Sequence, residues 1–143
     1  MRALLDVNVL IALLDGSHIH HRLATDWLER HIDAGWASSP ITQNGCIRIM
    51  SQQSYPNSVP VAQVAERLTE ATQHPSHQFW ADTVSLLQPD SIVWNKVLSS
   101  RHVTDAYLLA LAVQQRGRFV TLDRGVPLAA VSGALSAHLV IIL

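Results

Sequence analysis

Residues 104–123 restrict the possible folds of this chain more strongly than any other segment. The side chains from Ala106 to Val113 are almost all apolar, and in a helix they would cover every side. A helix that is apolar all round is typical of the centre of a domain rather than of its surface. Thr104 is a favourable N-cap, so we expect Asp105 in the first turn of this central helix.

A buried strand is expected directly after this helix. Gly117 ends the helical pattern, and residues 119–122 form a short apolar run that is followed by Asp123. Open α/β folds bind their ligands where parallel strands end and helices begin. Asp105 and Asp123 are therefore expected at a ligand-binding edge of a sheet.

A third carboxylate comes from the start of the chain. An apolar opening strand ends at Asp6, and residues 7–14 continue as an apolar helix. Asp6 thus occupies the same kind of strand end as Asp123. Each aspartate alone could be a helix cap, a turn residue or an exposed charge, but three at strand ends favour one shared site. We expect Asp6, Asp105 and Asp123 to converge on a divalent cation, since carboxylate oxygens suit Mg²⁺ and Mn²⁺.

The remaining apolar segments alternate between strands and helices. Strands are expected at 36–38, 79–80 and 139–142, and helices at 18–33, from Thr42, from Pro60 and within 124–137. Residues 85–100 fit neither pattern. This alternation predicts an α/β fold with a mostly parallel central sheet that is covered by helices on both faces.

Size and composition indicate one globular domain that spans residues 1–143. Hydrophobic residues make up 48% of the chain and charged residues 15%, which is typical of a compact protein. The single cysteine, Cys46, cannot form an internal disulfide, so we expect the cytoplasm as the location. Asp6 and Asn8 interrupt the apolar N-terminal run, which makes it too short and too polar to span a membrane. A net charge of −1 gives no global field that would attract nucleic acid.

Three other groups of residues have a structural interpretation and a functional one. His18, His20 and His21 could bind zinc, but Cys46 has no partner motif, so surface or structural histidines are expected. The four tryptophans could stack on bases, although their apolar surroundings favour core packing; they are Trp27, Trp36, Trp80 and Trp94. Four arginines near the acids in sequence either bind phosphate or lie solvated on the surface; they are Arg101, Arg116, Arg118 and Arg124.

Four motifs in this order resemble the PIN-domain toxins of VapC type. They are residues 5–11 (Leu-Asp-Val-Asn-Val-Leu-Ile), 40–45 (Pro-Ile-Thr-Gln-Asn-Gly), 103–112 (Val-Thr-Asp-Ala-Tyr-Leu-Leu-Ala-Leu-Ala) and 121–123 (Thr-Leu-Asp). The resemblance implies a PIN-like fold and a Mg²⁺-dependent ribonuclease, in which Mn²⁺ can substitute, that acts as the toxin of a type II toxin–antitoxin pair. It further implies that Asp6 and Asp105 are the principal metal ligands and that Asp123 is the C-terminal acidic residue of the site. RNA would be the substrate, and a VapB-type antitoxin and a second copy of the chain would be the partners.

One catalytic position departs from the family pattern. Members commonly carry a glutamate where this chain has Gln43, which offers a carbonyl oxygen but neither a charge nor a general base. Asn8 and Thr121 resemble polar neighbours of the acids and could orient a carboxylate or a water. Asn8 could equally be an N-cap, and Thr121 an ordinary strand residue.

Three functions are compatible with these residues. The first is hydrolysis of RNA phosphodiesters by a metal-activated water. The second is a catalytically weak module that binds RNA or an antitoxin, and Gln43 favours it. The third is a phosphotransferase of the haloacid-dehalogenase type with Asp6 as nucleophile. The residue two positions after that nucleophile is usually an acid, and Asn8 at this position counts against the third function.

Overall fold

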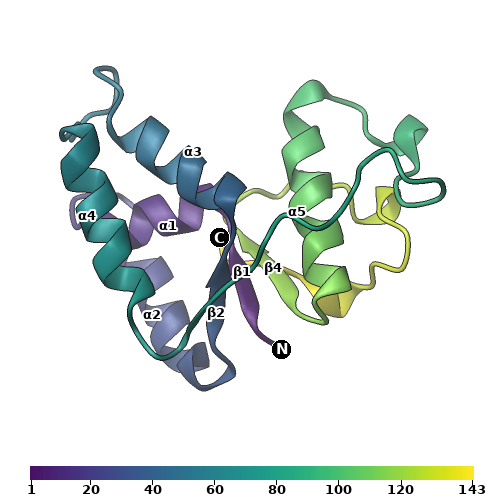
Figure 1. The fold of residues 1–143 in the computed structure, drawn as a ribbon, viewed down its shortest axis with the longest axis horizontal. Coiled ribbons are helices and arrows are strands. Elements are labelled where there is room, and N and C mark those ends of the chain that lie inside the picture. The colour runs from purple at the N-terminus through teal and green to yellow at the C-terminus, as the bar shows by residue number, and fades with distance from the viewer.

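A computed structural model describes residues 1–143 and contains one five-stranded sheet (Figure 1). The strand order is β3-β2-β1-β4-β5, and every neighbouring pair is parallel, which confirms the expected fold class. The strands are β1 (Ala3–Leu5), β2 (Trp36–Ser38), β3 (His77–Phe79), β4 (Arg118–Thr121) and β5 (Leu139–Ile141). Because all strands run the same way, their carboxyl ends meet at one edge, and β1 lies at its centre.

Helices cover both faces of this sheet. Four of them lie on one side, and α5 lies on the other with the irregular segments that precede and follow it (Figure 1). The helices are α1 (Val7–Leu14), α2 (His21–His31), α3 (Pro40–Met50), α4 (Val61–Thr72) and α5 (Val103–Gln114). The expected helix-covered sheet is therefore confirmed.

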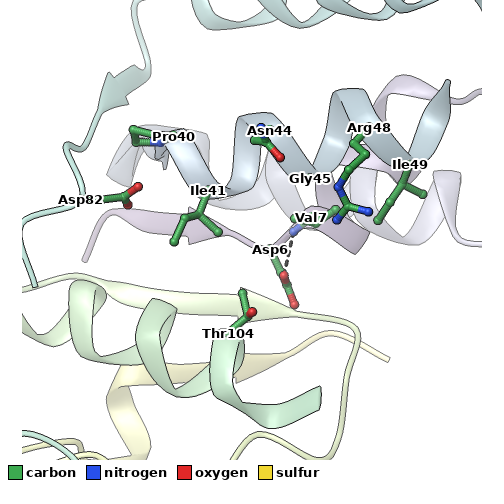
Figure 2. Close-up of a pocket in the computed structure, with 10 residues that line it drawn as sticks. All are labelled: Asp6, Val7, Pro40, Ile41, Asn44, Gly45, Arg48, Ile49, Asp82 and Thr104. Atoms are coloured by element: carbon green, nitrogen blue, oxygen red, sulfur yellow. Dashed lines mark hydrogen bonds between the residues drawn. The ribbon is translucent and has the colours of Figure 1, made fainter. Parts of the chain in front are cut away.

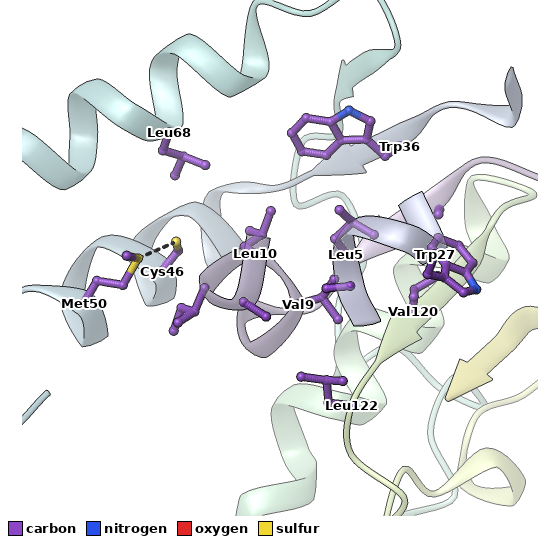
Figure 3. Close-up of a cluster of buried hydrophobic side chains, with 14 of the residues drawn as sticks. Leu5, Val9, Leu10, Trp27, Trp36, Cys46, Met50, Leu68, Val120 and Leu122 are labelled. Carbon is purple, nitrogen blue, oxygen red and sulfur yellow. Dashed lines mark hydrogen bonds between the residues drawn. The ribbon is translucent and has the colours of Figure 1, made fainter. Parts of the chain in front are cut away.

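The strands send alternate side chains into two separate cores. Leu5 and Val120 belong to the larger cluster, which α1 to α4 cover (Figure 3). Leu4 and Phe119 belong to the cluster under α5. All four of these side chains are completely buried. At about 25 cal/mol per Å² of apolar surface, each buried leucine or phenylalanine contributes roughly 2 kcal/mol, so the central strands are held firmly from both sides.

Several element boundaries differ from the sequence-based expectation. The third strand is His77–Phe79 instead of residues 79–80, because this edge strand is defined by backbone pairing with β2 and not by apolar side chains. Helix α3 begins at Pro40, two residues earlier than expected, because Ser39 forms a capping box with Thr42. No α-helix forms within residues 124–137, which contain only short 3₁₀ turns.

Most of the tryptophans and the single cysteine are buried in the fold. Trp27, Trp36 and Trp80 are buried as expected, whereas Trp94 is 45% exposed in a 3₁₀ turn of the irregular segment before α5. Cys46 is free and buried. None of the helices has the length and apolar character needed to cross a bilayer.

Candidate metal centre

Asp6 lies at the junction between the central strand β1 and helix α1. Asp6 is the N-cap of α1, and its Oδ1 accepts a hydrogen bond of 2.7 Å from the Val7 backbone amide. Its Oδ2 accepts a hydrogen bond of 2.6 Å from the Thr121 hydroxyl at the end of β4. The carboxylate is thus oriented from both its own helix and the neighbouring strand. Asp6 is only 7% exposed.

Asp105 lies in the first turn of α5, as expected, but its helix begins differently. The N-cap is His102, and a 3₁₀ turn over Ser100–His102 leads directly into the helix at Val103. Thr104 is therefore inside the helix and is not its N-cap. The reason is that the 3₁₀ turn already supplies the first backbone bonds, so no side-chain cap is formed at this end.

Asp123 follows β4 in a tight turn. Its backbone amide donates to the Thr121 hydroxyl at 3.0 Å, and its Oδ1 accepts from the Gly125 amide at 2.7 Å. These two bonds fix the turn and hold the carboxylate beside the other two acids. Asp123 is half-buried, and its charge acts on both Asp6 and Asp105.

Burial and neighbouring carboxylates raise the pKa values of Asp6 and Asp105. Burial is the main cause that raises the pKa of Asp6, and the Asp123 charge adds to it, although the bonds from Thr121 and Val7 act in the opposite direction. Burial and the charges of Asp6 and Asp123 raise the pKa of Asp105 to about 6, against a lowering effect of Arg101. Like charges gathered in a buried place are unfavourable unless a cation or protons neutralise them.

Thr121 and Asn8 connect the strand ends by further hydrogen bonds. The Asn8 side-chain amide donates to the Thr121 hydroxyl at 3.3 Å, and Asn8 Oδ1 accepts from the Leu122 backbone amide at 3.2 Å. Asn8 is therefore not the N-cap of α1, because Asp6 fills that position. Both residues lie beside the acids, where the resemblance implied polar neighbours.

His102 is a site residue that the sequence interpretation missed. One of its ring nitrogens and one oxygen each of Asp105 and Asp123 all lie within 4.8 Å of one another. The signal for it is the spacing of His102 and Asp105, since residues three apart share a face of a helix. His18, His20 and His21, which we expected to be structural or surface histidines, are not part of this group.

Gln43 makes its hydrogen bond away from the three aspartates. Its Nε2 donates to the buried Ser38 hydroxyl at 3.0 Å, and Ser38 Oγ lies 2.8 Å from His77 Nε2. Burial lowers the pKa of His77, and in the neutral ring Nε2 can accept the Ser38 proton. Gln43 Oε1 takes no part in this chain of bonds.

A polar pocket between α3 and α5 opens onto Asp6 (Figure 2). Asn44, Gly45 and Arg48 form its wall on α3, and Thr104 closes it from α5. Gly45 has to be small, because a methyl group there would lie 2.7 Å from Val7 Cγ2. The close contact between α3 and α1 brings the exposed Arg48 guanidinium to the same pocket as Asp6.

The residues at this edge fit a divalent cation. Asp6, Asp105 and Asp123 offer hard oxygen ligands, and the raised pKa values of Asp6 and Asp105 mark negative charge that the chain itself leaves poorly neutralised. Room for an ion also exists, since Gly125 has no side chain where a methyl group would press against Asp123 and His102.

The four arginines that are near the acids in sequence have different surroundings. Arg118 lies over the Trp27 ring at 5.1 Å from its centroid, and Arg124 donates to the Leu143 carbonyl at 3.0 Å. Arg101 is exposed and donates from Nε to His102 Nε2 at 3.4 Å. Arg116 is exposed with a positive φ of 56° at the end of α5. Of these four, only Arg101 acts on the pKa of a site aspartate.

Comparisons with known proteins show which family the sequence matches. The model of the PIN domain family matches residues 3–132. Ribonuclease VapC44 of Mycobacterium tuberculosis is 51% identical over 139 residues, which are 97% of this chain and 98% of VapC44. Ribonuclease VapC39 of the same organism is 41% identical over the full length of both chains.

A solved structure shares the fold at much lower identity. It is the crystal structure of VapBC2 from Rickettsia felis bound to a DNA fragment from its promoter. The matched chain has a TM-score of 0.59 and 16% identity, and the match covers 86% of this chain and 89% of the other.

Proposed function

The chain belongs to the VapC ribonucleases of the PIN-domain family, the toxins of type II toxin–antitoxin systems, and on this premise we propose how it acts. PIN nucleases depend on a metal ion. In our proposal, Asp6, Asp105 and Asp123 hold Mg²⁺, with Mn²⁺ as a substitute, and the chain hydrolyses RNA phosphodiesters. The observation that supports the proposal is that Asp105 and Asp123 have carboxylate oxygens within 4.8 Å of each other, and that the Asp6 charge helps to raise the pKa of Asp105.

Each residue has a defined task in this proposal. Asp6 and Asp105 bind the cation directly, and Asp123 completes the negative charge at the edge of the sheet. Thr121 holds the Asp6 carboxylate in one rotamer, and Asn8 holds the Thr121 hydroxyl. When bound, the cation supplies the Lewis acidity that activates a water and offsets the charge on the phosphate.

Gln43 occupies the position of the family glutamate and supports catalysis less directly. Its amide is engaged with Ser38, so only its neutral Oε1 remains for a water or a substrate group. Because position 43 has no carboxylate, we propose that the site binds a single cation. Asn8 stands two positions after Asp6, where a phosphotransferase with Asp6 as nucleophile would usually carry an acid, and this speaks against that function.

The RNA strand is proposed to lie in the pocket between α3 and α5. The Arg48 guanidinium lies on its wall and can bind a phosphate next to the scissile one, in the bidentate way that lysine cannot. A net charge of −1 means that binding depends on this local arginine and on the cation rather than on a global field.

The partners and the setting follow from family membership. We propose that residues 1–143 act as one PIN domain, as a homodimer and in the cytoplasm. A VapB-type antitoxin would neutralise the toxin; the VapBC2 structure from Rickettsia felis supports this partner. The excess negative charge at the three aspartates favours an antitoxin that inserts a cationic side chain, such as an arginine, beside them.

An RNA cleavage assay with and without a chelator tests the proposal. The purified chain is incubated with a mixed RNA substrate in Mg²⁺, in Mn²⁺ and in EDTA, with Asp105→Asn as the matched control. Cleavage should require the metal and should be lost in the variant. A chain that cuts RNA equally well in EDTA, or without the Asp105 charge, would remove the metal from the reaction.

A further inference from the structure

We propose that His102 is a fourth protein ligand of the divalent cation and makes the site prefer Mn²⁺ to Mg²⁺. The inference rests on the proposed function, because the cation is the one that Asp105 and Asp123 hold there. It goes beyond that function in naming a nitrogen ligand and a metal preference that follows from it.

The first support is the position of the imidazole. One His102 ring nitrogen lies within 4.8 Å of an oxygen of Asp105 and of Asp123, with those two oxygens equally close to each other. A cation that bonds to three atoms at about 2.0–2.2 Å holds them roughly 3–4 Å apart. Small side-chain rotations therefore suffice to bring the three groups onto one ion.

The second support is the way the chain delivers these groups. His102 ends the 3₁₀ turn over Ser100–His102 and caps α5, and Asp105 follows one turn later on the same side. Both residues are therefore fixed by the same rigid helix start. Asp123 comes from the turn after β4, where the Gly125 and Thr121 bonds hold it.

The third support is the missing side chain at Gly125. A methyl group on this residue would lie 2.8 Å from His102 Nε2 and 3.3 Å from Asp123 Oδ1. The φ of Gly125 is not in the left-handed region, so its backbone conformation does not itself require glycine. The glycine thus leaves open the space in which the imidazole and the carboxylate approach each other.

The contact between Arg101 and the imidazole leaves His102 accessible to a cation. Arg101 Nε donates to His102 Nε2 at 3.4 Å. Arg101 is exposed and can turn into solvent when a cation binds Nε2. The neutral imidazole is the usual metal-binding form of histidine.

The metal preference follows from the donor set. Mg²⁺ is a hard ion that prefers oxygen ligands and retains its waters, whereas transition metals accept imidazole nitrogen readily. Three carboxylates alone discriminate little between Mg²⁺ and Mn²⁺. Adding one imidazole favours Mn²⁺, and removal of the imidazole should abolish most of that preference.

Electron paramagnetic resonance of the full-length, metal-free and tag-free protein with Mn²⁺ tests this inference. Electron spin-echo modulation from ¹⁴N reports an imidazole bound directly to Mn²⁺, and titration of the free-ion signal gives the Kd. Competition with Mg²⁺ gives the preference between the two ions. The variants are His102→Gln, Gly125→Ala and, as the matched control, His74→Gln in the exposed turn before β3.

The wild-type protein and His74→Gln should show ¹⁴N modulation, and His102→Gln should lose it. We expect the Mn²⁺ Kd of His102→Gln to rise by roughly tenfold, and the Mg²⁺ Kd to change much less. Gly125→Ala should weaken Mn²⁺ binding through the displaced imidazole while the charges stay the same. Because the imidazole is the end of a mobile side chain, this variant keeps the fold, which circular dichroism verifies.

Bound Mn²⁺ without ¹⁴N modulation in the wild-type protein would overturn the role of His102, and so would modulation that persists in His102→Gln. Either result leaves the carboxylate site and the proposed nuclease function standing. Mn²⁺ binding that is unchanged in Asp105→Asn would show instead that the ion binds elsewhere, and both proposals would then fail.

Discussion

Thr121 donates a hydrogen bond of 2.6 Å to Asp6 Oδ2 across 115 positions of sequence. The two residues close neighbouring parallel strands, and Asp6 N also donates to the Val120 carbonyl at 2.9 Å. The same Thr121 oxygen accepts from the Asp123 amide. One buried hydroxyl thus joins two of the proposed metal ligands, so the orientation of the carboxylates depends on it.

Thr121→Val should weaken metal binding without removing a ligand. Valine keeps the shape of threonine, but Asp6 Oδ2 loses its donor and the Asp123 amide loses its acceptor. The pKa of Asp6 should rise further, because the Thr121 bond lowers it. We expect metal affinity to fall by roughly tenfold and the free energy of unfolding to fall by about 1–2 kcal/mol.

Calorimetric titration with Mn²⁺ and urea denaturation measure the two effects of Thr121→Val. Thr121→Ser is the matched control, since it keeps the hydroxyl and should bind metal nearly as the wild type does. Equal affinities for the valine and serine variants would show that the hydroxyl does not orient the ligand.

Asp105→Asn should abolish cleavage and yet stabilise the metal-free protein at neutral pH. The pKa of Asp105 is about 6 in the folded chain and 3.8 in the reference state. The folded state therefore binds this proton more tightly, and the contribution of Asp105 to stability declines as the pH rises from about 4 to about 6. Asparagine avoids this loss, which is worth about 1–2 kcal/mol after allowance for solvent screening.

Thermal unfolding in EDTA at pH 7.5 and at pH 4 measures this difference. The Tm of Asp105→Asn should exceed that of the wild type at pH 7.5, and the two should approach each other at pH 4. A variant that is less stable than the wild type at pH 7.5 would contradict the repulsion among the three aspartates.

Metal binding by the wild-type protein should strengthen as the pH rises through about 6. Protons compete with the cation for Asp105, whose pKa burial and the charges of Asp6 and Asp123 raise to about 6. Below that value, affinity should fall by up to about tenfold per pH unit. Mn²⁺ titrations between pH 5 and 8 measure the slope, and a pH-independent affinity would exclude Asp105 as a ligand.

The apolar pattern of the sequence predicts the central elements well and the peripheral ones poorly. Strands β1 and β4 and helix α5 are buried, so their apolar runs identify them. Strand β3 is an edge strand with exposed residues, and only its pairing with β2 defines it. Residues 85–100 are held by distant contacts, such as the Val93 amide bond of 2.8 Å to the Ala130 carbonyl, which no local pattern reveals.

In the site, too, the sequence predicts the residues whose position depends on local structure and misses those whose orientation depends on distant contacts. The placement of Asp6, Asp105 and Asp123 at one edge of the sheet is predictable, because each lies at a strand end or a helix start. The orientations of His102 and Gln43 are not, because one depends on a 3₁₀ turn before α5 and the other on a buried serine. Both are consequences of packing that a single sequence does not reveal.

Gln43→Glu should raise the pKa of His77. In the wild type, Ser38 accepts from Gln43 and lies within hydrogen-bond distance of His77 Nε2, and the pKa of His77 is lowered by burial. A carboxylate cannot donate, so Ser38 would have to give its proton to Glu at position 43. His77 Nε2 would then have to donate to Ser38, and the carboxylate charge at position 43 would favour the cationic form of the ring.

NMR measures this change if the chemical shifts of the His77 ring protons are followed as the pH is varied. We expect its pKa to be higher in Gln43→Glu than in the wild type. Gln43→Met is the matched control, because it removes the amide without adding a charge or an acceptor. Identical titration curves for the glutamate variant and the wild type would contradict the proposed chain of hydrogen bonds.

Arg48→Gln should weaken RNA binding and leave metal binding intact. The Arg48 side chain lines the pocket that opens onto Asp6, and it is exposed enough to meet a phosphate (Figure 2). Loss of one phosphate contact reduces the slope of log affinity against log salt by roughly 0.7 for single-stranded RNA. Binding of a non-cleaved RNA in Ca²⁺, measured by fluorescence anisotropy at several salt concentrations, gives this slope. Arg30→Gln on the exposed face of α2 is the matched control, and an equal loss in both variants would mean that Arg48 acts only through net charge.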